Sequence, residues 1–264
     1  MILAVTNEKG GVGKTTTVVN LGAILAVEHQ KRVLIVDLDP QAHATLSFLA
    51  HVPDKRHTIY PVLLGLSSIQ DVIVPLPDYK DLALAPSCLD LSAAELALLS
   101  YDSEYRNTRL REALEPVQEE YDYILVDCPP SLGVLSINAL VAARKVLIPL
   151  TLEELPLHAL VPLLKTLIAV HSNFNPLLEP FGLLPTKVER TRLNNRIINE
   201  IKIGIRIPGG NGTLRVKLNV LPPIPKSVRV AEAPGAKKAL IYYAPDHPAT
   251  WAYREVARRV LEEI

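Results

Sequence analysis

One short segment restricts the fold of this chain more than any other. Residues 9–16 read Lys-Gly-Gly-Val-Gly-Lys-Thr-Thr and lie between the apolar run 2–5 and an apolar helical pattern. Glycines between a strand and a helix let backbone N–H groups close around a phosphate, and the helix N-terminus favours negative charge. The segment therefore predicts a phosphate-binding loop. Its residues are Lys9, Gly10, Gly11, Val12, Gly13, Lys14, Thr15 and Thr16.

The loop departs from the common phosphate-loop pattern at its first position. The pattern G-x-x-x-x-G-K-[ST], aligned on residues 13–15, requires glycine at position 8, where this chain has Glu8. The chain instead carries an additional lysine, Lys9, at the start of the loop. The pattern K-G-G-x-G-K-[ST] resembles the deviant Walker A motif of the ParA/MinD superfamily of ATPases.

This resemblance implies a nucleotide site that two subunits share. In phosphate loops the lysine, here Lys14, reaches the β- and γ-phosphates, and the hydroxyl of the next residue, here Thr15, binds Mg²⁺. In the ParA/MinD superfamily the first lysine, here Lys9, reaches across a dimer interface to the nucleotide of the other subunit. We therefore expect ATP and Mg²⁺ as cofactors and a homodimer bridged by ATP.

Three aspartates follow apolar runs that we interpret as buried strands. Asp37 and Asp39 come after residues 33–36, and Asp127 comes after residues 123–126. Ligands of open parallel sheets bind beyond the carboxyl ends of the strands. These carboxylates are therefore expected beside the phosphate loop.

The segments around these aspartates resemble the switch regions of the same superfamily. Residues 37–45 resemble switch I, which implies that Asp39 orients or activates the attacking water and that Asp37 lies near the metal. Residues 127–133 resemble switch II, and Asp127 then corresponds to a Walker B aspartate that holds Mg²⁺ directly or through water. The resemblance implies catalytic roles for Lys9, Lys14 and Asp39, and a metal site formed by Thr15, Asp37 and Asp127.

Apolar runs alternate with helical patterns along the chain. Such continuous apolar strands, separated by helices, indicate an α/β fold with a doubly wound, mainly parallel sheet and helices on both faces. No linker divides the chain, so we expect a single P-loop ATPase domain over residues 1–264, without an N-terminal helix-turn-helix domain. Strands are predicted at 2–7, 33–36, 123–126, 146–148 and 181–184, and helices at 15–29 and 249–264.

The resemblance continues beyond the loop and the switches. Residues 121–127, 136–140 and 227–234 resemble the short, Soj-like chromosomal type of ParA. Within that type, Pro225 and Ser227 match positions that face the adenine, and Ser227 stands where the family often has Asn. His43 also stands at a position where Asn is common, and we interpret it as a tolerated loop substitution.

The formal net charge is zero, but the two parts of the chain differ in charge. Residues 1–150 carry 12 Lys and Arg against 18 Asp and Glu, whereas residues 151–264 carry 16 against 10. This asymmetry is compatible with a polyanion-binding face and with a solvated basic surface. The resemblance favours DNA, because ParA proteins bind it without sequence preference after ATP has paired two subunits. The expected DNA-binding residues are Arg190, Arg192, Arg215, Lys217, Lys226 and Arg229.

A glycine-rich segment interrupts this basic part of the chain. Residues 205–213 read as a strand end and a turn, and residues 214–220 alternate between apolar and polar side chains. The alternation predicts a half-exposed strand or a hairpin with a basic outer face. Two interpretations stay open: the turn projects beside the DNA-binding face, or it is a surface insertion without a role in binding.

The resemblance as a whole predicts a Mg²⁺-dependent ATPase that acts as a nucleotide switch in DNA segregation. The ATP-bridged dimer holds non-specific double-stranded DNA, and a ParB-like partner stimulates hydrolysis, which releases the dimer. No segment approaches the ~20 consecutive apolar residues that a membrane span needs. We therefore expect a cytoplasmic, nucleoid-associated protein without membrane contact.

Other functions of the same nucleotide module stay open. One alternative is a MinD-like ATPase that docks on a membrane, but the last helix carries Glu255, Glu262 and Glu263, so we expect it to pack on the protein. Another is a ParA-like positioner of a cargo other than DNA. A third is a ligase similar to dethiobiotin synthetase. Cys88 and Cys128 lack metal-ligand spacing, and we interpret them as small apolar residues.

Overall fold

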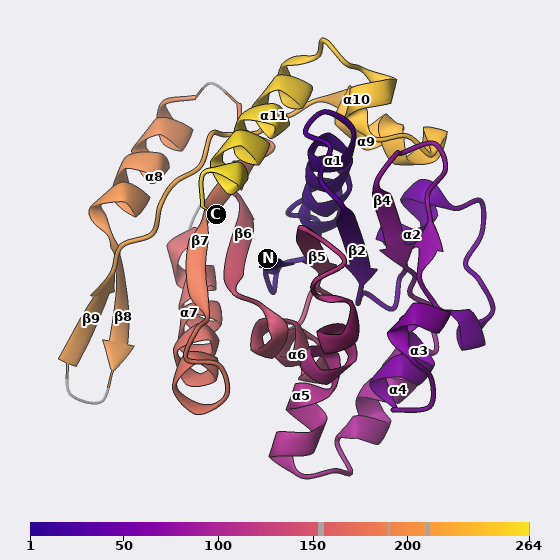
Figure 1. Ribbon diagram of the computed structural model, residues 1–264. Coiled ribbons are helices and arrows are strands. Elements are labelled where there is room, and N and C mark those ends of the chain that lie inside the picture. The colour runs from indigo at the N-terminus through magenta and orange to yellow at the C-terminus, as the bar shows by residue number, and fades with distance from the viewer. Residues whose placement is uncertain (153–155, 190, 210–211, 264) are drawn as a thin grey trace.

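A mainly parallel sheet forms the centre of the molecule (Figure 1). The computed structural model describes residues 1–264 apart from 153–155, 190, 210–211 and 264. Seven of the described strands form a sheet of order β3-β4-β2-β5-β1-β6-β7, in which only β3, at one edge, is antiparallel to its neighbour, and β8 and β9 form a separate two-stranded sheet. This confirms the predicted sheet. The strands are β1 (Ile2–Val5), β2 (Val33–Asp37), β3 (Val74–Pro75), β4 (Leu82–Ala85), β5 (Tyr123–Asp127), β6 (Lys145–Thr151), β7 (Glu179–Thr186), β8 (Ile205–Gly209) and β9 (Gly212–Val216).

Helices cover both faces of the sheet, as predicted, and the alternation of side chains along β1 shows why. Ile2 and Ala4 belong to the apolar core under α5, α6 and α7, whereas Leu3 and Val5 belong to the core under α1 and α11. A strand that is apolar on both faces is stable only when both faces are covered. The helices are α1 (Lys14–Val27), α2 (His43–Phe48), α3 (Ile59–Leu63), α4 (Leu91–Leu98), α5 (Ser103–Leu114), α6 (Val134–Ala142), α7 (Pro156–Asn173), α8 (Arg192–Ile203), α9 (Val228–Glu232), α10 (Leu240–Tyr243) and α11 (Pro248–Leu261).

The five predicted strands are present, but β3 and β4 were not predicted. The sequence of β4 contains only Leu and Ala, which favour helices more than strands. All four of its residues are buried, and β4 pairs with β2 on one side and β3 on the other. Tertiary packing, not local preference, therefore makes this segment a strand.

The C-terminal helix packs on the body of the protein, as expected. Tyr253, Val256 and Val260 of α11 are fully buried, and the Tyr253 hydroxyl lies 3.4 Å from the hydroxyl of Thr17 in α1. Among the helices that the structure describes, none is long and apolar enough to cross a membrane.

The predicted hairpin is present at one edge of the molecule, where β8 pairs antiparallel with β9 (Figure 1). Its turn, residues 210–211, lies outside the described residues, so its position beside a DNA-binding face stays a prediction. After β9 the chain returns along β7. The Leu183 N–H donates to the Asn219 carbonyl at 2.8 Å, and the Leu221 N–H donates to the Leu183 carbonyl at 2.9 Å. The returning segment is thus fixed against the sheet.

Gly182 allows this close approach, and its substitution tests the packing. A β-carbon at Gly182 would come within 2.8 Å of the Asn219 carbonyl oxygen. We expect Gly182→Ala to lower the free energy of unfolding by about 1–3 kcal/mol, because the backbone must shift. Chemical denaturation measures the change.

Gly235→Ala is the matched control, because a β-carbon there meets no atom within 4 Å. We expect it to stay within about 0.5 kcal/mol of the parent. Equal stabilities of Gly182→Ala and the parent protein would contradict the close packing of residues 219–221 on β7.

Candidate nucleotide site

The phosphate loop joins β1 to α1, and two of its glycines adopt a backbone conformation that other residues avoid. Gly11 has φ 72° and Gly13 has φ 91°, both in the left-handed region where a β-carbon is unfavourable. Helix α1 begins at Lys14, directly after Gly13, and its first turn carries no acidic residue. The positive end of this helix is therefore not neutralised by a side chain of its own first turn.

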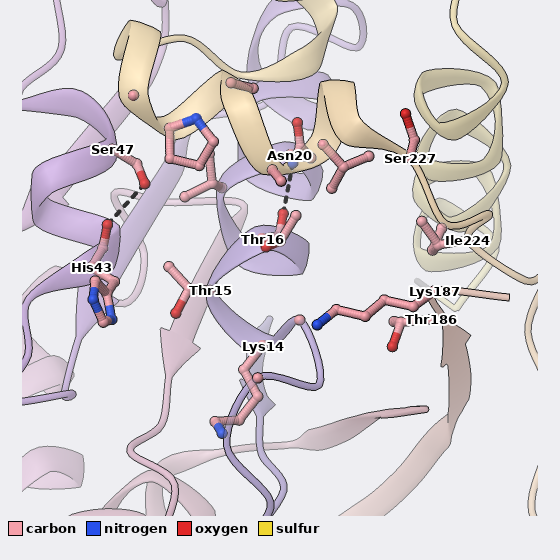
Figure 2. Close-up of a pocket in the computed structure, with 18 of the residues that line it drawn as sticks. Lys14, Thr15, Thr16, Asn20, His43, Ser47, Thr186, Lys187, Ile224 and Ser227 are labelled. Atoms are coloured by element: carbon pink, nitrogen blue, oxygen red, sulfur yellow. Dashed lines mark hydrogen bonds between the residues drawn. The ribbon is translucent and has the colours of Figure 1, made fainter. Parts of the chain in front are cut away.

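The loop forms one wall of a cavity of about 950 Å³ (Figure 2). The other walls come from segments far apart in the sequence: the start of α2, the end of β7, residues 224–228 and the turn before α10. Figure 2 shows Lys14, Thr15 and Thr16 on one side and Ile224 and Ser227 on the opposite side. The residues predicted for the nucleotide and metal sites that lie on the cavity wall are Gly10, Gly11, Gly13, Lys14, Thr15, Thr16, Asp39, Pro225 and Ser227, and Lys226, predicted to bind DNA, also lies on it.

Val12 and Lys9 are placed differently from the loop residues on the cavity wall. Val12 is buried, and its carbonyl accepts a hydrogen bond from the Thr186 hydroxyl at 2.7 Å. Lys9 is exposed at the start of the loop. Its N–H donates to the Asn7 side-chain oxygen at 3.0 Å, and its carbonyl accepts from the Lys14 ammonium at 3.2 Å. The backbone of Lys9 is therefore fixed on both sides.

Lys14 is a buried cation. Its side chain folds back onto the loop, and only 6% of the residue is exposed. Burial lowers the pKa of Lys14, and the nearby Asp127 carboxyl opposes this most strongly. An ammonium in these surroundings gains from a bound anion, since little water solvates it.

Asp37 lies at the end of β2 and is fully buried. Thr45 donates to one oxygen of Asp37 from its N–H and from its hydroxyl, both at 2.8 Å, and the Asp39 N–H donates to the other oxygen at 3.1 Å. Burial nevertheless raises the pKa of Asp37 to about 7. Asp39 itself is 7% exposed and reaches the cavity wall.

Asp127 occupies the end of β5, between β1 and β2. It lies opposite Val5 of β1 and Asp37 of β2 in the strand register. The residue is fully buried, and neither carboxyl oxygen has a hydrogen-bond partner among the described residues. Burial raises the pKa of Asp127 well above its usual range, and the carboxyls of Asp37 and Asp39 add to the rise, whereas Thr15 and Lys14 oppose it.

These groups fit a hard cation that takes oxygen ligands. An unpartnered buried carboxyl is rare unless an ion, water or ligand completes it, and Mg²⁺ prefers one or two carboxylates together with phosphate and water. No cluster of three or more His, Cys, Asp or Glu suited to a metal occurs within the described part of the chain. Cys88 and Cys128 are buried free thiols.

Sequence reasoning missed two residues of this site, Thr186 and Lys187. Thr186 is the last residue of β7 and Lys187 follows it, at the same edge of the sheet as Asp37 and Asp127. The signal that revealed those aspartates, a polar residue directly after an apolar strand, also marks Thr186 and Lys187. It was passed over because neither residue belongs to a phosphate or metal motif.

The segment that carries Pro225 and Ser227 is fixed to the end of β7. Backbone hydrogen bonds join Ile224 to Pro185 at 2.8 Å and Lys226 to Val188 at 3.1 Å. Ser227 caps α9, because its hydroxyl oxygen accepts from the Arg229 N–H at 3.1 Å. The cavity wall opposite the phosphate loop is therefore held in place by the sheet.

The structure describes the side chains of four of the predicted DNA-binding residues. Arg190 lies outside the described residues, as does the side chain of Arg215. Arg192, Lys217, Lys226 and Arg229 are exposed. Lys226 pairs with Glu189 at 2.6 Å and Arg229 with Glu232 at 3.4 Å, so neighbouring carboxylates partly offset both charges. Arg192 begins α8 and Arg229 lies in α9, and Figure 1 shows α11 between these helices.

Known proteins resemble this chain over most of its length. A family model described as an AAA domain matches residues 1–180. The sporulation initiation inhibitor protein Soj of Bacillus subtilis (strain 168) is 40% identical over 260 residues, which cover 98% of this chain and 97% of Soj. The chromosome partitioning protein ParA of Myxococcus xanthus (strain DK1622) is 36% identical over 263 residues, which cover 99% of this chain and 88% of that protein.

A solved structure shares the fold. It is described as cobyrinic acid a,c-diamide synthase from Mycobacterium smegmatis with bound ATP analog and magnesium. It is 35% identical, has a TM-score of 0.83, and the match covers 99% of this chain and 94% of that chain. The sheet and the phosphate loop define a P-loop ATPase. The family model and the relatives show that the chain belongs to the AAA domain family, as an ATPase of the ParA/Soj partitioning type.

The buried carboxyl pair should make the protein without ligand less stable at higher pH. Because the folded-state pKa of Asp37 is raised to about 7, the folded protein holds a proton that the unfolded chain loses from about pH 4 upward. The stability contribution of the pair is therefore present below about pH 4 and is lost as the pH rises towards about 7.

Asp127→Asn removes one charge of this pair. In buffer without Mg²⁺ or nucleotide, we expect this variant to exceed the parent in stability by about 0.5–2 kcal/mol near pH 7.5, and by less near pH 5. Denaturant titrations at the two pH values measure the difference. A variant that is equally destabilised at both would contradict the uncompensated burial of Asp127.

Proposed function

We propose that this chain is a Mg²⁺-dependent ATPase that acts as a nucleotide switch in DNA segregation, with residues 1–264 as one ATPase domain. The observation that carries the proposal is the pairing of a phosphate loop with an unpartnered, fully buried carboxyl, Asp127. A Mg²⁺–nucleotide complex satisfies both, because phosphate meets the loop and the cation meets the carboxyl. The partitioning roles named for Soj-type relatives support DNA segregation as the purpose.

Each residue of the site has a part in this proposal. Gly10 to Thr16 and Lys14 bind the phosphates, and Pro225 and Ser227 face the base. Thr15, Asp37 and Asp127 would hold Mg²⁺, and the cation would offset the negative charge of the phosphates. Asp39 is held near the cavity, with its side chain accepting the Gln41 N–H at 2.9 Å, and it orients the attacking water.

Lys9 connects the nucleotide to a second subunit. Its backbone is fixed by Asn7 and Lys14, while the residue itself is exposed, which suits a side chain that must reach another molecule. An ammonium close to phosphates of a neighbouring subunit makes the triphosphate part of the dimer interface. ATP shifts the population towards the dimer only because it binds the dimer more tightly than the monomer.

The dimer then binds double-stranded DNA through basic residues of the second half of the chain. Arg190, Arg192, Arg215, Lys217, Lys226 and Arg229 are the candidates, and two copies of each double the charge. Contacts of this kind give sequence-independent affinity that falls steeply with salt. In this proposal the protein is associated with the nucleoid, and a ParB-like partner stimulates hydrolysis and releases the dimer.

A second candidate function follows from the description of the M. smegmatis structure as a diamide synthase. A ligase of that class would use ATP to activate a carboxylate of a small substrate. Its ATP turnover would depend on the small substrate and be independent of DNA. The experiment below therefore separates the two functions.

Asp39→Ala should separate nucleotide binding from hydrolysis. Loss of one general-base contact typically lowers a rate ~10²- to 10⁴-fold, so this variant should retain ATP and stay in the DNA-binding state. We expect tight DNA binding with ATP and weak binding with ADP or without nucleotide. Titrations of a DNA duplex over a salt series, together with single-turnover hydrolysis, make the measurement.

Asp78→Ala is the control, because Asp78 is exposed in the loop between β3 and β4. It should hydrolyse ATP and bind DNA like the parent. Equal DNA binding by Asp39→Ala with ATP, with ADP and without nucleotide would remove the switch from the proposal. ATP turnover without any DNA binding would favour the ligase.

A further inference from the structure

Lys187 extends into the nucleotide cavity from the end of β7. It belongs to the cavity wall, and Figure 2 shows its side chain crossing the pocket with the ammonium directed towards the phosphate loop. The residue is exposed, and no hydrogen bond or ion pair of its side chain occurs among the described residues. It therefore presents a cation to whatever ligand the cavity holds.

The backbone at Lys187 is strained. Its φ is 52°, in the left-handed region that glycine, asparagine and aspartate adopt more readily than lysine. Such residues persist where the surrounding structure over-determines them, and they cluster at ligand sites. Hydrogen bonds of the two neighbouring residues, Thr186 and Val188, hold Lys187 in this conformation. The Thr186 hydroxyl is within hydrogen-bonding distance of the Val12 and Leu150 carbonyls, at 2.7 and 3.1 Å, and the Val188 N–H donates to the Ile224 carbonyl at 3.0 Å.

The charge of the cavity wall indicates the ligand chemistry. The described wall carries five lysines but a single carboxylate, Asp39. Three of the lysines have local partners: Lys14 the Lys9 carbonyl, Lys226 the Glu189 carboxylate, and Lys237 the Leu46 carbonyl. The two lysines for which no such partner occurs among the described residues are Lys187 and Lys238.

The Lys187 ammonium is directed to a place that favours an anion. It points towards the start of α1, where the helix dipole and the Lys14 ammonium already create a positive potential. A phosphate bound between these groups attracts the Lys187 ammonium, so the repulsion is replaced by an attraction. The arrangement therefore favours a polyanion between the phosphate loop and the end of β7.

We propose that Lys187 binds the phosphate chain of the nucleotide as a second ammonium from the same subunit, beside Lys14. This inference rests on the proposed nucleotide site, and it assigns to Lys187 the part of a phosphate-binding residue. In this inference Lys187 contacts the charged phosphates, whereas residues 224–228 contact the base and determine which base is bound.

Lys187→Met removes the charge while keeping the length of the side chain. With the full chain and Mg²⁺, we expect ATP and ADP to bind roughly 10- to 150-fold more weakly, as for loss of a contact to a charged group. Adenosine, used as a competitor of a fluorescent ATP analogue, should bind as in the parent. The loss for ATP should shrink at high salt, because an exposed ion pair is screened.

Three further variants make the result specific. Lys187→Arg should keep most of the affinity. Lys187→Asn should bind ATP as weakly as Lys187→Met but melt at a higher temperature than it, because asparagine tolerates the left-handed backbone. Lys165→Met, an exposed lysine of α7 on the other side of the sheet, should behave like the parent.

Equal affinity of Lys187→Met and the parent for ATP would overturn the inference. So would an equal loss for adenosine and ATP, because the side chain would then pack against the nucleoside. If the parent protein itself bound no ATP, or if Lys14→Ala bound it as well as the parent, the proposed function would fail instead. The two failures are thus distinguishable.

Discussion

Burial of charge at one edge of the sheet is the constraint on which this structure depends. Strands β2, β5 and β1 are parallel neighbours, so their ends bring Asp37, Asp127 and the phosphate loop to the same place. Lys14 is buried there as well, and its pKa is lowered by burial while the pKa values of both carboxyls are raised. The fold therefore maintains an electrostatic arrangement that costs stability until phosphate and cation complete it.

The same edge connects the nucleotide cavity to the segment we assign to switch I. The Ser87 hydroxyl donates to the Asp39 carbonyl at 2.7 Å, and the Ser87 N–H donates to the Thr45 hydroxyl at 2.9 Å. On the far side, the Lys237 ammonium bonds to the Leu46 carbonyl of α2. A ligand in this cavity contacts both the phosphate loop and the turn that carries Lys237. Its binding can therefore affect the position of α2, and a nucleotide switch needs such a connection.

The sequence predicted the elements whose pattern is strong and missed those that only tertiary structure defines. The apolar runs at β1, β2 and β5 and the glycines of the loop were sufficient for the main sheet and the phosphate loop. The strand β4 has the composition of a helix, and its place between β2 and β3 decides its conformation. The cavity role of Lys187 was also hidden, because it depends on a left-handed backbone and on the anchoring of Thr186 to Val12.

The central claim is that a triphosphate joins two copies of this chain through Lys9. Sedimentation velocity of the full chain with Mg²⁺ and a non-hydrolysable ATP analogue, ADP or no nucleotide tests it most directly, with Lys9→Ala beside the parent and Lys165→Met as the control. The account predicts that the mass doubles only with the triphosphate, in the parent and in the control, and that Lys9→Ala stays monomeric. A parent that remains monomeric with the triphosphate, or a Lys9→Ala protein that dimerises as the parent does, would contradict it.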